Sequence, residues 1–328
     1  MIKKIKIMIL ILILFVALTL SVMSVVAKVN LKYAHDTSLT HINHISALKF
    51  KELIESKSNG EIEITIYPQG QLGHQREIAE GIIMGTVDIG DVSVGPMPAW
   101  LPYFQLWGIP YLIRDREHAF KILDGEIGEK WKQDILAQGM LCMGWGEIGM
   151  RHLTNDVRPI HTVEDMAGLK FRVHESKIWI ATMKALNATG VPIAFGELYT
   201  SLQQGVVDGQ ENPYATINSM KFYEVQKYCT ATGHIFTPNL FLMNPKKFNS
   251  LSKEDQELIK EVFAETIAYQ RQYQIDMEAS HLADIKAAGM EVNENPDKIA
   301  FIEATKNVAE AIKDDVPPDL VEMVRNIE

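Results

Sequence analysis

Residues 29–93, VNLKYAHDTSLTHINHISALKFKELIESKSNGEIEITIYPQGQLGHQREIAEGIIMGTVDIGDVS, contain the alternation that decides the fold. Short runs of alternating apolar and polar residues are typical of strands, and longer runs with apolar residues every three or four positions are typical of helices. The expected strands are 29–35, 61–68 and 86–93, and the expected helices are 41–60 and 74–85. Strands that alternate with helices in this way predict an α/β fold.

A later part of the chain repeats this alternation of strands and helices. We expect a strand at 190–195 and a helix at 196–205, followed by a third element at 206–213. In both copies a glycine ends the helix and Val-Asp follows, as Gly85-Thr-Val-Asp-Ile-Gly in the first and Gly205-Val-Val-Asp-Gly-Gln in the second. The repetition suggests two lobes of similar construction with a ligand cleft between them, because clefts between domains are frequent ligand sites.

A long helical pattern runs from Ser252 to Gly289, and Ser252 with Asp255 resembles a capping pair at its start. About 36 helical residues span roughly 54 Å at 1.5 Å per residue. A lobe of about 150 residues is not much wider than about 32 Å, to judge from its radius of gyration. We therefore expect this helix to cross from one lobe to the other.

The first 27 residues differ in composition from the rest of the chain. Lys3, Lys4 and Lys6 precede an uncharged and largely aliphatic run that ends with small residues at Ala27. This order predicts an export signal peptide over residues 1–27, cut after Ala27. The alternative is an uncleaved membrane anchor, because about 20 apolar residues are long enough to span a bilayer.

The charge of the chain excludes one class of function. The 328 residues include 32 basic and 42 acidic side chains, for a formal charge of -10. Without the three leader lysines, the body has 29 basic and 42 acidic residues, a net charge of -13. An acidic body argues against a nucleic-acid partner, because binding to phosphates needs a basic face.

Two other segments have simpler interpretations than their patterns suggest. Residues 144–149 fit G-x-G-x-x-G, but the helix that a dinucleotide-binding site requires does not follow, since turn residues and Pro159 come next. Residues 95–110 hold four prolines and four aromatic residues. We interpret them as a packed irregular segment, because proline disfavours helix interiors and central strands.

The histidines and cysteines give no strong sign of a metal or redox site. His35, His41 and His44 cluster in the sequence, but surface or helix-capping histidines are the preferred interpretation over a metal site. Cys142 and Cys229 are interpreted as small buried hydrophobic residues, with a disulfide after export as the alternative. We expect no cofactor and no metal.

Arg172 is the candidate binding residue that the strand pattern singles out. In LKFRV (169–173), alternation places Leu169, Phe171 and Val173 on one face and Arg172 on the other. Arg172 lies at the carboxyl end of this expected strand, where ligands gather in open α/β sheets. A guanidinium group can bind a carboxylate with two hydrogen bonds. From the spacing alone, a surface arginine that forms a salt bridge with Asp or Glu is the preferred interpretation.

Four segments of the sequence resemble the DctP-type solute-binding proteins of tripartite ATP-independent periplasmic (TRAP) transporters. They are YPQGQLG (67–73), LKFRV (169–173), FGELYTSLQQGVVDGQENP (195–213) and KFYEVQK (221–227). The resemblance spans almost all of the body. It implies a two-lobed α/β fold like that of periplasmic binding proteins, without catalysis. It also implies a receptor in the periplasm that binds a small organic acid and passes it to a sodium-driven membrane permease.

The resemblance also implies a set of ligand-binding residues. The family's arginine that binds the ligand carboxylate falls on Arg172, and a second arginine falls on Arg151. The asparagine of the E-N-P segment falls on Asn212, and an aromatic residue that packs on the ligand falls on Phe195. Positions of the family's site that vary between members fall on His35 and Ser93. Because some sialic-acid binders carry glutamate where this chain has Ser93, the resemblance disfavours sialic acid.

The class of ligand stays open between two kinds of acid. Trp179, seven residues after Arg172, resembles members that bind sugar acids, so a uronate or an aldonate is preferred; helix packing is its alternative role. The E-N-P segment with two basic residues also suits a four-carbon dicarboxylate. A secreted enzyme that uses Glu211 and a histidine, and a sensing receptor without transport, are the alternative functions. The expected lobes are 28–148 plus 238–277, and 149–237 plus 278–328.

Overall fold

The computed structural model describes residues 28–328. The predicted signal peptide at 1–27 therefore lies outside the described residues. The strands are β1 Val29–Ala34, β2 Ile62–Tyr67, β3 Ile89–Ser93, β4 Leu141–Asn155, β5 Lys170–Val173, β6 Thr189–Pro192, β7 Gly209–Pro213, β8 Tyr228–Thr230, β9 Phe236–Met243 and β10 Glu291–Asn293. The α-helices are α2 Ile42–Lys57, α3 Gln75–Met84, α4 Arg116–Leu123, α5 Glu126–Ala137, α6 Lys177–Ala185, α7 Leu198–Gln203, α8 Tyr214–Ser219, α9 Pro245–Asn249, α10 Lys253–Ala287, α11 Lys298–Thr305 and α12 Pro318–Arg325.

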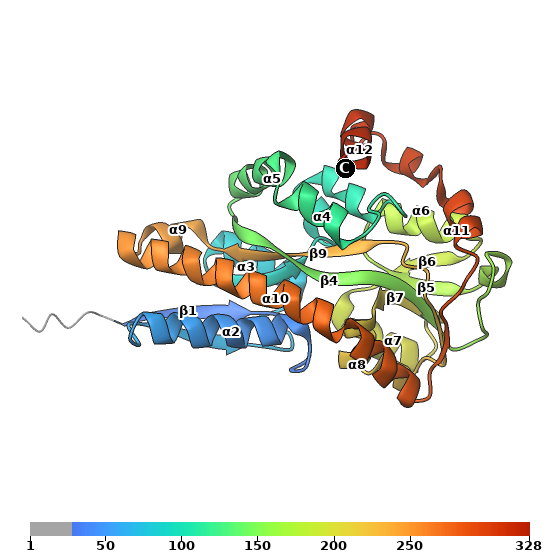
Figure 1. Cartoon of the computed structure of the whole chain (residues 1–328), viewed down its shortest axis with the longest axis horizontal. Coiled ribbons are helices and arrows are strands. Elements are labelled where there is room, and N and C mark those ends of the chain that lie inside the picture. The colour runs from blue at the N-terminus through green and yellow to red at the C-terminus, as the bar shows by residue number, and fades with distance from the viewer. Residues whose placement is uncertain (1–27) are drawn as a thin grey trace, which may run out of the picture.

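The strands form a mixed sheet that runs through two lobes, in the order β2-β1-β3-β9-β4-β7-β5-β6 (Figure 1). The first lobe contains the parallel strands β1, β2 and β3. The second contains the parallel strands β5, β6 and β7. The strand β4 joins them, because its first part pairs with β9 and its last five residues pair with β7. The expected α/β fold is therefore confirmed.

The repeated Gly-x-Val-Asp segment has the same geometry in both lobes. Gly85 and Gly205 both adopt positive φ angles, 82° and 67°, which glycine tolerates without a steric penalty. Asp88 Oδ2 accepts a hydrogen bond of 2.8 Å from the backbone N–H of Lys32 in β1. Asp208 Oδ2 accepts one of 2.7 Å from the backbone N–H of Lys170 in β5. The two lobes thus share a local construction, as the sequence repeat suggested.

The predicted long helix is α10, which extends over 35 residues. The Ser252 side chain caps its start by accepting a hydrogen bond of 3.0 Å from the Asp255 backbone N–H. In the first lobe, Phe263 packs on Phe50 of α2 with ring centroids 4.2 Å apart. In the second lobe, Asn218 of α8 donates to Asp284 of α10 at 2.9 Å. Figure 1 shows the helix running along both lobes, so the lobe-crossing prediction is confirmed.

The G-x-G-x-x-G segment lies inside β4 and serves helix packing. A Cβ added to Gly146 would lie 2.7 Å from Gln270 Oε1 of α10, and one added to Gly144 would overlap Ile267 of the same helix. Gln270 Oε1 also accepts a hydrogen bond of 3.1 Å from the backbone N–H of Glu147. The glycines therefore allow α10 to approach the strand closely.

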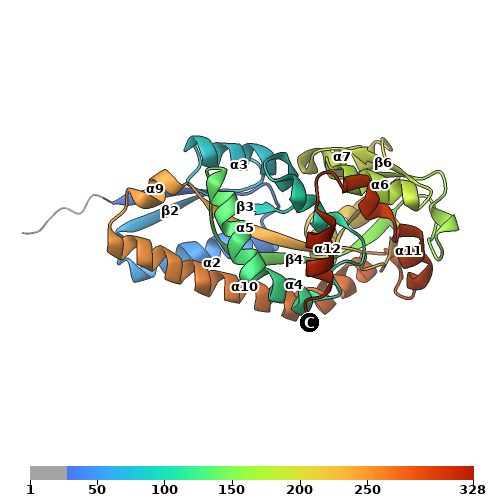
Figure 2. The same ribbon diagram turned by 90° about the horizontal axis from the view of Figure 1, so that it is seen from above.

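The C-terminal segment contacts both lobes. Its 3₁₀-helix η6 (Val308–Ile312) packs on α6 of the second lobe. Further on, the carbonyl oxygen of Val324 in α12 is 2.9 Å from His118 Nε2 of α4, and Arg114 Nη1 donates to the carbonyl oxygen of Arg325 at 2.9 Å. Figure 2 shows α12 beside α4. The lobe boundaries expected from the sequence stay a prediction.

The remaining sequence interpretations concern local features. Residues 95–110 form two 3₁₀-helices, η1 (Met97–Ala99) and η2 (Pro102–Gly108), with Phe104 and Trp107 buried. Cys142 and Cys229 are both buried and unpaired. Between residues 28 and 328 no helix combines the length and the apolar character that crossing a membrane requires.

Candidate functional site

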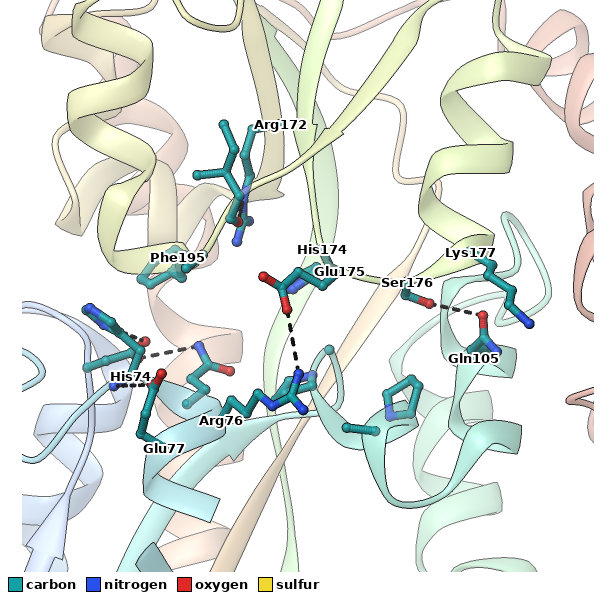
Figure 3. A pocket seen from close by; sticks show the side chains of 18 of the residues that line it. His74, Arg76, Glu77, Gln105, Arg172, His174, Glu175, Ser176, Lys177 and Phe195 are labelled. Atoms are coloured by element: carbon teal, nitrogen blue, oxygen red, sulfur yellow. Dashed lines mark hydrogen bonds and ion pairs between the residues drawn. The ribbon is translucent and has the colours of Figure 1, made fainter. Parts of the chain in front are cut away.

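A cavity of about 480 Å³ lies between the two lobes (Figure 3). The first lobe contributes the loop after β1, the start of α3 and the segment of η1 and η2. The second lobe contributes the ends of β5 and β6 and the start of α6. The lining residues are Asp36, His74, Gln75, Arg76, Glu77, Gly95, Pro96, Pro98, Ala99, Pro102, Gln105, Arg172, His174, Glu175, Ser176, Lys177, Ile193, Ala194, Phe195 and Asp315.

Arg172 lies at the carboxyl end of β5, and its side chain is only 2% exposed. Its Nε donates a hydrogen bond of 2.7 Å to the carbonyl oxygen of Ile193, which orients the guanidinium group. The guanidinium carbon lies 5.9 Å from the ring centroid of Phe195. The buried Nη1 has no hydrogen-bond partner in the protein. Burial, and then the nearby charge of Arg151, lower the pKa of Arg172 to about 10.

A buried ion pair lies behind Arg172 in the second lobe. Arg151 binds Glu211 through Nε and through Nη2, which is 2.9 Å from Glu211 Oε1. Arg151 Nη2 also donates to Asn212 Oδ1 at 2.9 Å. Trp179 Nε1 donates to Glu211 Oε1 at 3.2 Å. Burial alone raises the pKa of Glu211, but Arg151 and His234 outweigh it and hold the pKa below its usual range.

The wall formed by the first lobe contains a carboxylate, an imidazole and an amide. Asp36 is the second residue after β1 and is 5% exposed, and His74 is the residue that precedes α3. Asp36 Oδ1 accepts a hydrogen bond of 3.4 Å from Gln75 Nε2. Asp36 Oδ2 lies 3.8 Å from His74 Nδ1. The Asp36 carboxylate raises the pKa of His74 above its ordinary value, against the effect of burial.

Polar contacts join the lobes beside the cavity. Ser176 Oγ donates to Gln105 Oε1 at 3.2 Å, and Arg76 Nη1 lies 3.9 Å from Glu175 Oε2 (Figure 3). Asp315 Oδ2, from the C-terminal segment, accepts hydrogen bonds of 2.8 Å from both Gln105 and Lys177. These contacts connect η2, α3 and the C-terminal segment to the loop before α6 and to α6 itself.

Two glycines lie in close contact with histidine side chains of the opposite lobe. A Cβ on Gly95 of the first lobe would lie 2.5 Å from His174 Nδ1 of the second. A Cβ on Gly196 of the second lobe would overlap the imidazole of His74 of the first. The lobes are therefore in direct contact around the cavity, as in a closed form.

The structure places the seven predicted site residues in three settings. Arg172 and Phe195 line the cavity. Arg151, Asn212 and Trp179 belong to the buried network around Glu211, and Trp179 is 2% exposed. The remaining two, His35 and Ser93, are buried in the first lobe behind the cavity wall.

The two residues of the first lobe are bonded to their neighbours. His35 Nε2 is 3.0 Å from His44 Nδ1, so His35 is buried rather than at the surface. His41 caps α2, as one of the two sequence interpretations expected, by accepting a hydrogen bond from the Asn43 N–H. Ser93 Oγ donates to Gln75 Oε1 at 2.6 Å, so Ser93 orients a lining residue. Among residues 28–328, no group of three or more potential ligands is placed to hold a metal ion.

Several lining residues were not predicted from the sequence. Asp36 carries a usable signal, because it follows a strand at the carboxyl edge, where the reasoning that selected Arg172 also applies. His74 and Gln75 lie at the start of a helix that points to the same edge. Asp315 offers no such signal, because it reaches the cavity from the far end of the chain.

Comparisons with known proteins agree with this architecture. The model of the bacterial extracellular solute-binding protein family 7, DctP, matches residues 33–315. The 2,3-diketo-L-gulonate-binding periplasmic protein YiaO of Escherichia coli is 33% identical over 308 residues, which cover 93% of this chain and 94% of that protein.

Solved structures of TRAP periplasmic solute-binding proteins superpose closely on the chain. The protein from Polaromonas sp. JS666 bound to D-erythronate has a TM-score of 0.88 at 32% identity, covering 92% of this chain and 99% of that one. The protein from Sulfitobacter sp. NAS-14.1 with bound β-D-galacturonate has a TM-score of 0.86 at 31% identity, covering 90% and 99%. These relatives are receptors and not enzymes. The chain belongs to the DctP family, family 7 of the bacterial extracellular solute-binding proteins.

Proposed function

We propose that this protein is the extracytoplasmic receptor of a TRAP transporter, which binds a small organic acid between its lobes and delivers it to a sodium-driven permease. The observation that carries the proposal is the buried and unpartnered Nη1 of Arg172, a residue that lines the cavity between the lobes. A ligand carboxylate supplies the missing acceptor. Phe195 packs beside the guanidinium group and limits the position of that carboxylate.

The strength of this pairing follows from the surroundings of Arg172. A hydrogen bond to an ionised group is roughly twice as strong as one between neutral groups, and exclusion of water strengthens the attraction further. The other basic side chains of the lining already have acidic neighbours, since Lys177 binds Asp315 and Arg76 lies 3.2 Å from Glu80. Arg172 is therefore the lining cation that we assign to the ligand.

The ligand class follows from the relatives and from the polar lining. YiaO is named for 2,3-diketo-L-gulonate, and the two solved relatives hold D-erythronate and β-D-galacturonate. We assign a hydroxylated acid of this kind, a uronate or an aldonate, to the present chain. A four-carbon dicarboxylate is the second class. Its second carboxylate would lack the cation that Arg151 was expected to offer, because Arg151 is bound by Glu211.

Ligand binding and transport are connected through closure of the lobes. Arg172 belongs to the second lobe, whereas Asp36, His74 and Gln75 belong to the first, so a ligand that contacts both sets stabilises the closed form. A ligand shifts the population toward the state that it binds more tightly. The permease then recognises the closed surface. The leader at 1–27 directs the chain to the periplasm, either as a cleaved signal peptide or as a retained anchor.

Glu211, the proposed acid or base of the alternative enzymatic function, is unsuited to that role. Glu211 is fully buried and held by Arg151, and its pKa lies below the usual range, so it has no proton to exchange near neutral pH. A general acid or base works best when its pKa lies near the operating pH. A receptor that releases its ligand unchanged therefore fits the site better.

The test is a thermal-shift screen of uronates, aldonates and dicarboxylates, because a ligand that binds the native state raises the unfolding midpoint. We expect at least one acid to stabilise the wild type and the control Arg325→Gln, in which an exposed arginine of α12 is replaced. Arg172→Gln should lose about 2–5 kcal/mol of binding free energy and with it most of the shift. An Arg172→Gln protein that binds as tightly as the wild type contradicts the assignment.

A further inference from the structure

The last part of the chain is attached to both lobes, and we call residues 308–327 the C-terminal strap. Its 3₁₀-helix η6 packs on α6 of the second lobe, with Val308 and Ile312 buried. The first lobe holds α12, since His118 Nε2 of α4 lies 2.9 Å from the carbonyl oxygen of Val324. Figure 2 shows the red C-terminal part of the chain running from α11 beside α6 to α12 beside α4.

Asp315 lies in the strap between η6 and α12 and contacts both lobes. Its Oδ2 accepts a hydrogen bond of 2.8 Å from Gln105 Nε2 of the first lobe and another of 2.8 Å from Lys177 Nζ of the second. Gln105 is oriented by Ser176, whose Oγ donates to Gln105 Oε1 at 3.2 Å. Lys177, and then Gln105, lower the pKa of Asp315, so its carboxylate is ionised at neutral pH.

From this arrangement we infer that the C-terminal strap holds the lobes closed, with Asp315 as the residue that links Gln105 of η2 to Lys177 of α6. The inference rests on the proposed function and names what regulates the opening of its site. One oxygen atom accepts both hydrogen bonds, so a rotation that moves α6 away from η2 breaks at least one of them. Asp315 therefore stabilises the closed form and not the open form.

Asp315 also lines the cavity, which gives it a second effect of opposite sign. Its negative charge repels an anionic ligand, so loss of the charge alone would strengthen the binding of an acid. Loss of the link between the lobes would instead weaken binding, because the apparent affinity falls with the population of the closed form. The direction of the change in affinity therefore separates the two roles.

The exposure of the contact sets the size of the effect. The side chains of Lys177 and Asp315 are 68% and 21% exposed, so water and salt screen their attraction. Exposed ion pairs are weak, and the expected change in the population of the closed form is about 2- to 5-fold. The strap thus favours closure without preventing the lobes from opening to release the ligand.

Calorimetric titration and stopped-flow kinetics with D-erythronate, D-galacturonate and succinate test the inference. Asp315→Asn keeps the size of the side chain and removes its charge. We expect it to bind the best of these acids about 2- to 5-fold more weakly, through faster dissociation. Lys177→Met should weaken binding to a similar degree. The double variant should bind as tightly as Lys177→Met alone, because both substitutions remove the same contact.

The neighbouring Asp314 provides a control of equal charge. It is exposed on the same strap, and Asp314→Asn should bind the acids like the wild type.

A second measurement reports on the lobes without any ligand. Spin labels at Met84→Cys on α3 and at Val206→Cys after α7 occupy exposed positions on different lobes, and the two native cysteines are buried. Electron–electron resonance then gives the distance between the labels. Without ligand, Asp315→Asn should shift the distances toward the open form, whereas Asp314→Asn should not.

The outcomes distinguish the strap from the receptor function. If Asp315→Asn binds the acid as tightly as the wild type or more tightly, or if the label distances stay unchanged, the inference is wrong while the receptor function stands. If none of the three acids nor any acid of the thermal-shift screen binds the wild type, the proposed function fails. The label distances then still decide whether Asp315 holds the lobes together.

Discussion

Arg151 and Glu211 form an ion pair in the interior of the second lobe, with exposed fractions of 2% and 0%. The pair also holds Asn212, through Arg151 Nη2, and Trp179, through Glu211 Oε1. The carboxylate of Glu211 therefore neutralises the positive charge of Arg151 within the second lobe. Arg172, next to this network, keeps an unpartnered N–H group, and for this reason we propose Arg172, and not Arg151, as the residue that binds the ligand.

The first prediction concerns the stability that this ion pair provides. Arg151→Met leaves the Glu211 carboxylate buried without its cation, so we expect the free energy of unfolding to fall by about 3–5 kcal/mol. Urea unfolding measures the loss. In the double variant Arg151→Met, Glu211→Gln the buried charge is absent, and the loss should be smaller than in the single variant. An Arg151→Met protein with wild-type stability and no ligand binding would instead assign Arg151 to the ligand.

The second prediction concerns closure of the lobes at Gly196. In Gly196→Val a side chain occupies the position where the His74 imidazole of the first lobe now packs, so the closed form becomes less favourable. We expect ligand affinity to fall about 10-fold, since affinity scales with the population of the binding-competent state. Small-angle scattering should show a smaller decrease in the radius of gyration on addition of ligand. Thr200→Ala, an exposed site on α7, is the control and should close normally.

The third prediction concerns pH. Burial, followed by nearby positive charges, lowers the pKa of His35, His41 and His152 to about 3. In the unfolded chain these histidines bind protons near pH 6.5, whereas in the folded protein they stay neutral until about pH 3. Protonation therefore favours the unfolded chain, so the free energy of unfolding is highest above pH 6.5 and decreases as the pH falls toward 3. The expected slope is about 1.4 kcal/mol per pH unit for each histidine below pH 6.5, measured by urea unfolding between pH 7.5 and 5.

A single variant tests the histidine assignment. His41→Asn keeps a side-chain acceptor at the start of α2, because asparagine is a favourable capping residue. The substitution removes one titrating group. Below pH 6.5, the slope of the free energy of unfolding against pH should therefore decrease by about 1.4 kcal/mol per pH unit. An unchanged slope would show that other groups cause the acid destabilisation.

The fourth prediction compares two glycines that allow close packing. A Cβ on Gly209 would overlap the backbone carbonyl oxygen of Thr154, which cannot move without breaking the pairing of β7 with β4. A Cβ on Gly146 would instead meet the side chains of Gln270 and Phe241, and no backbone atom of the sheet. Both alanine variants should be destabilised, by about 1–3 kcal/mol, with Gly209→Ala the more affected. Equal losses in chemical denaturation would contradict this order.

Much of the fold was predictable because it depends on local patterns. The strands and helices of residues 29–93 follow from periodicity and from the glycine and proline residues that end them. The long helix starts at the residue after Ser252, as the capping pair predicted, because a cap is made by neighbours three residues apart. Arg172 was selected by strand alternation and by its place at the end of a strand, and it lines the cavity.

The site was less predictable because its members meet only through packing. The G-x-G-x-x-G segment resembles a nucleotide site in sequence, but its glycines are explained by the approach of α10, more than 100 residues further on. His74 and Asp36 carry no motif that relates them. They line the same cavity because β1 ends and α3 begins at the same edge of the first lobe.

By itself, the sequence determined the α/β lobes, the helix that crosses them and the membership of the family, since these depend on residues that are close together along the chain. The tertiary structure alone decided which polar side chains face the cavity. Strand alternation predicts on which face of the sheet a side chain lies, but not which group it contacts. Arg151 binds the carboxylate of Glu211, 60 residues further along the chain, whereas the Nη1 of Arg172 has no partner. That difference depends on how β4, β5 and β7 pack together, and no local pattern encodes it.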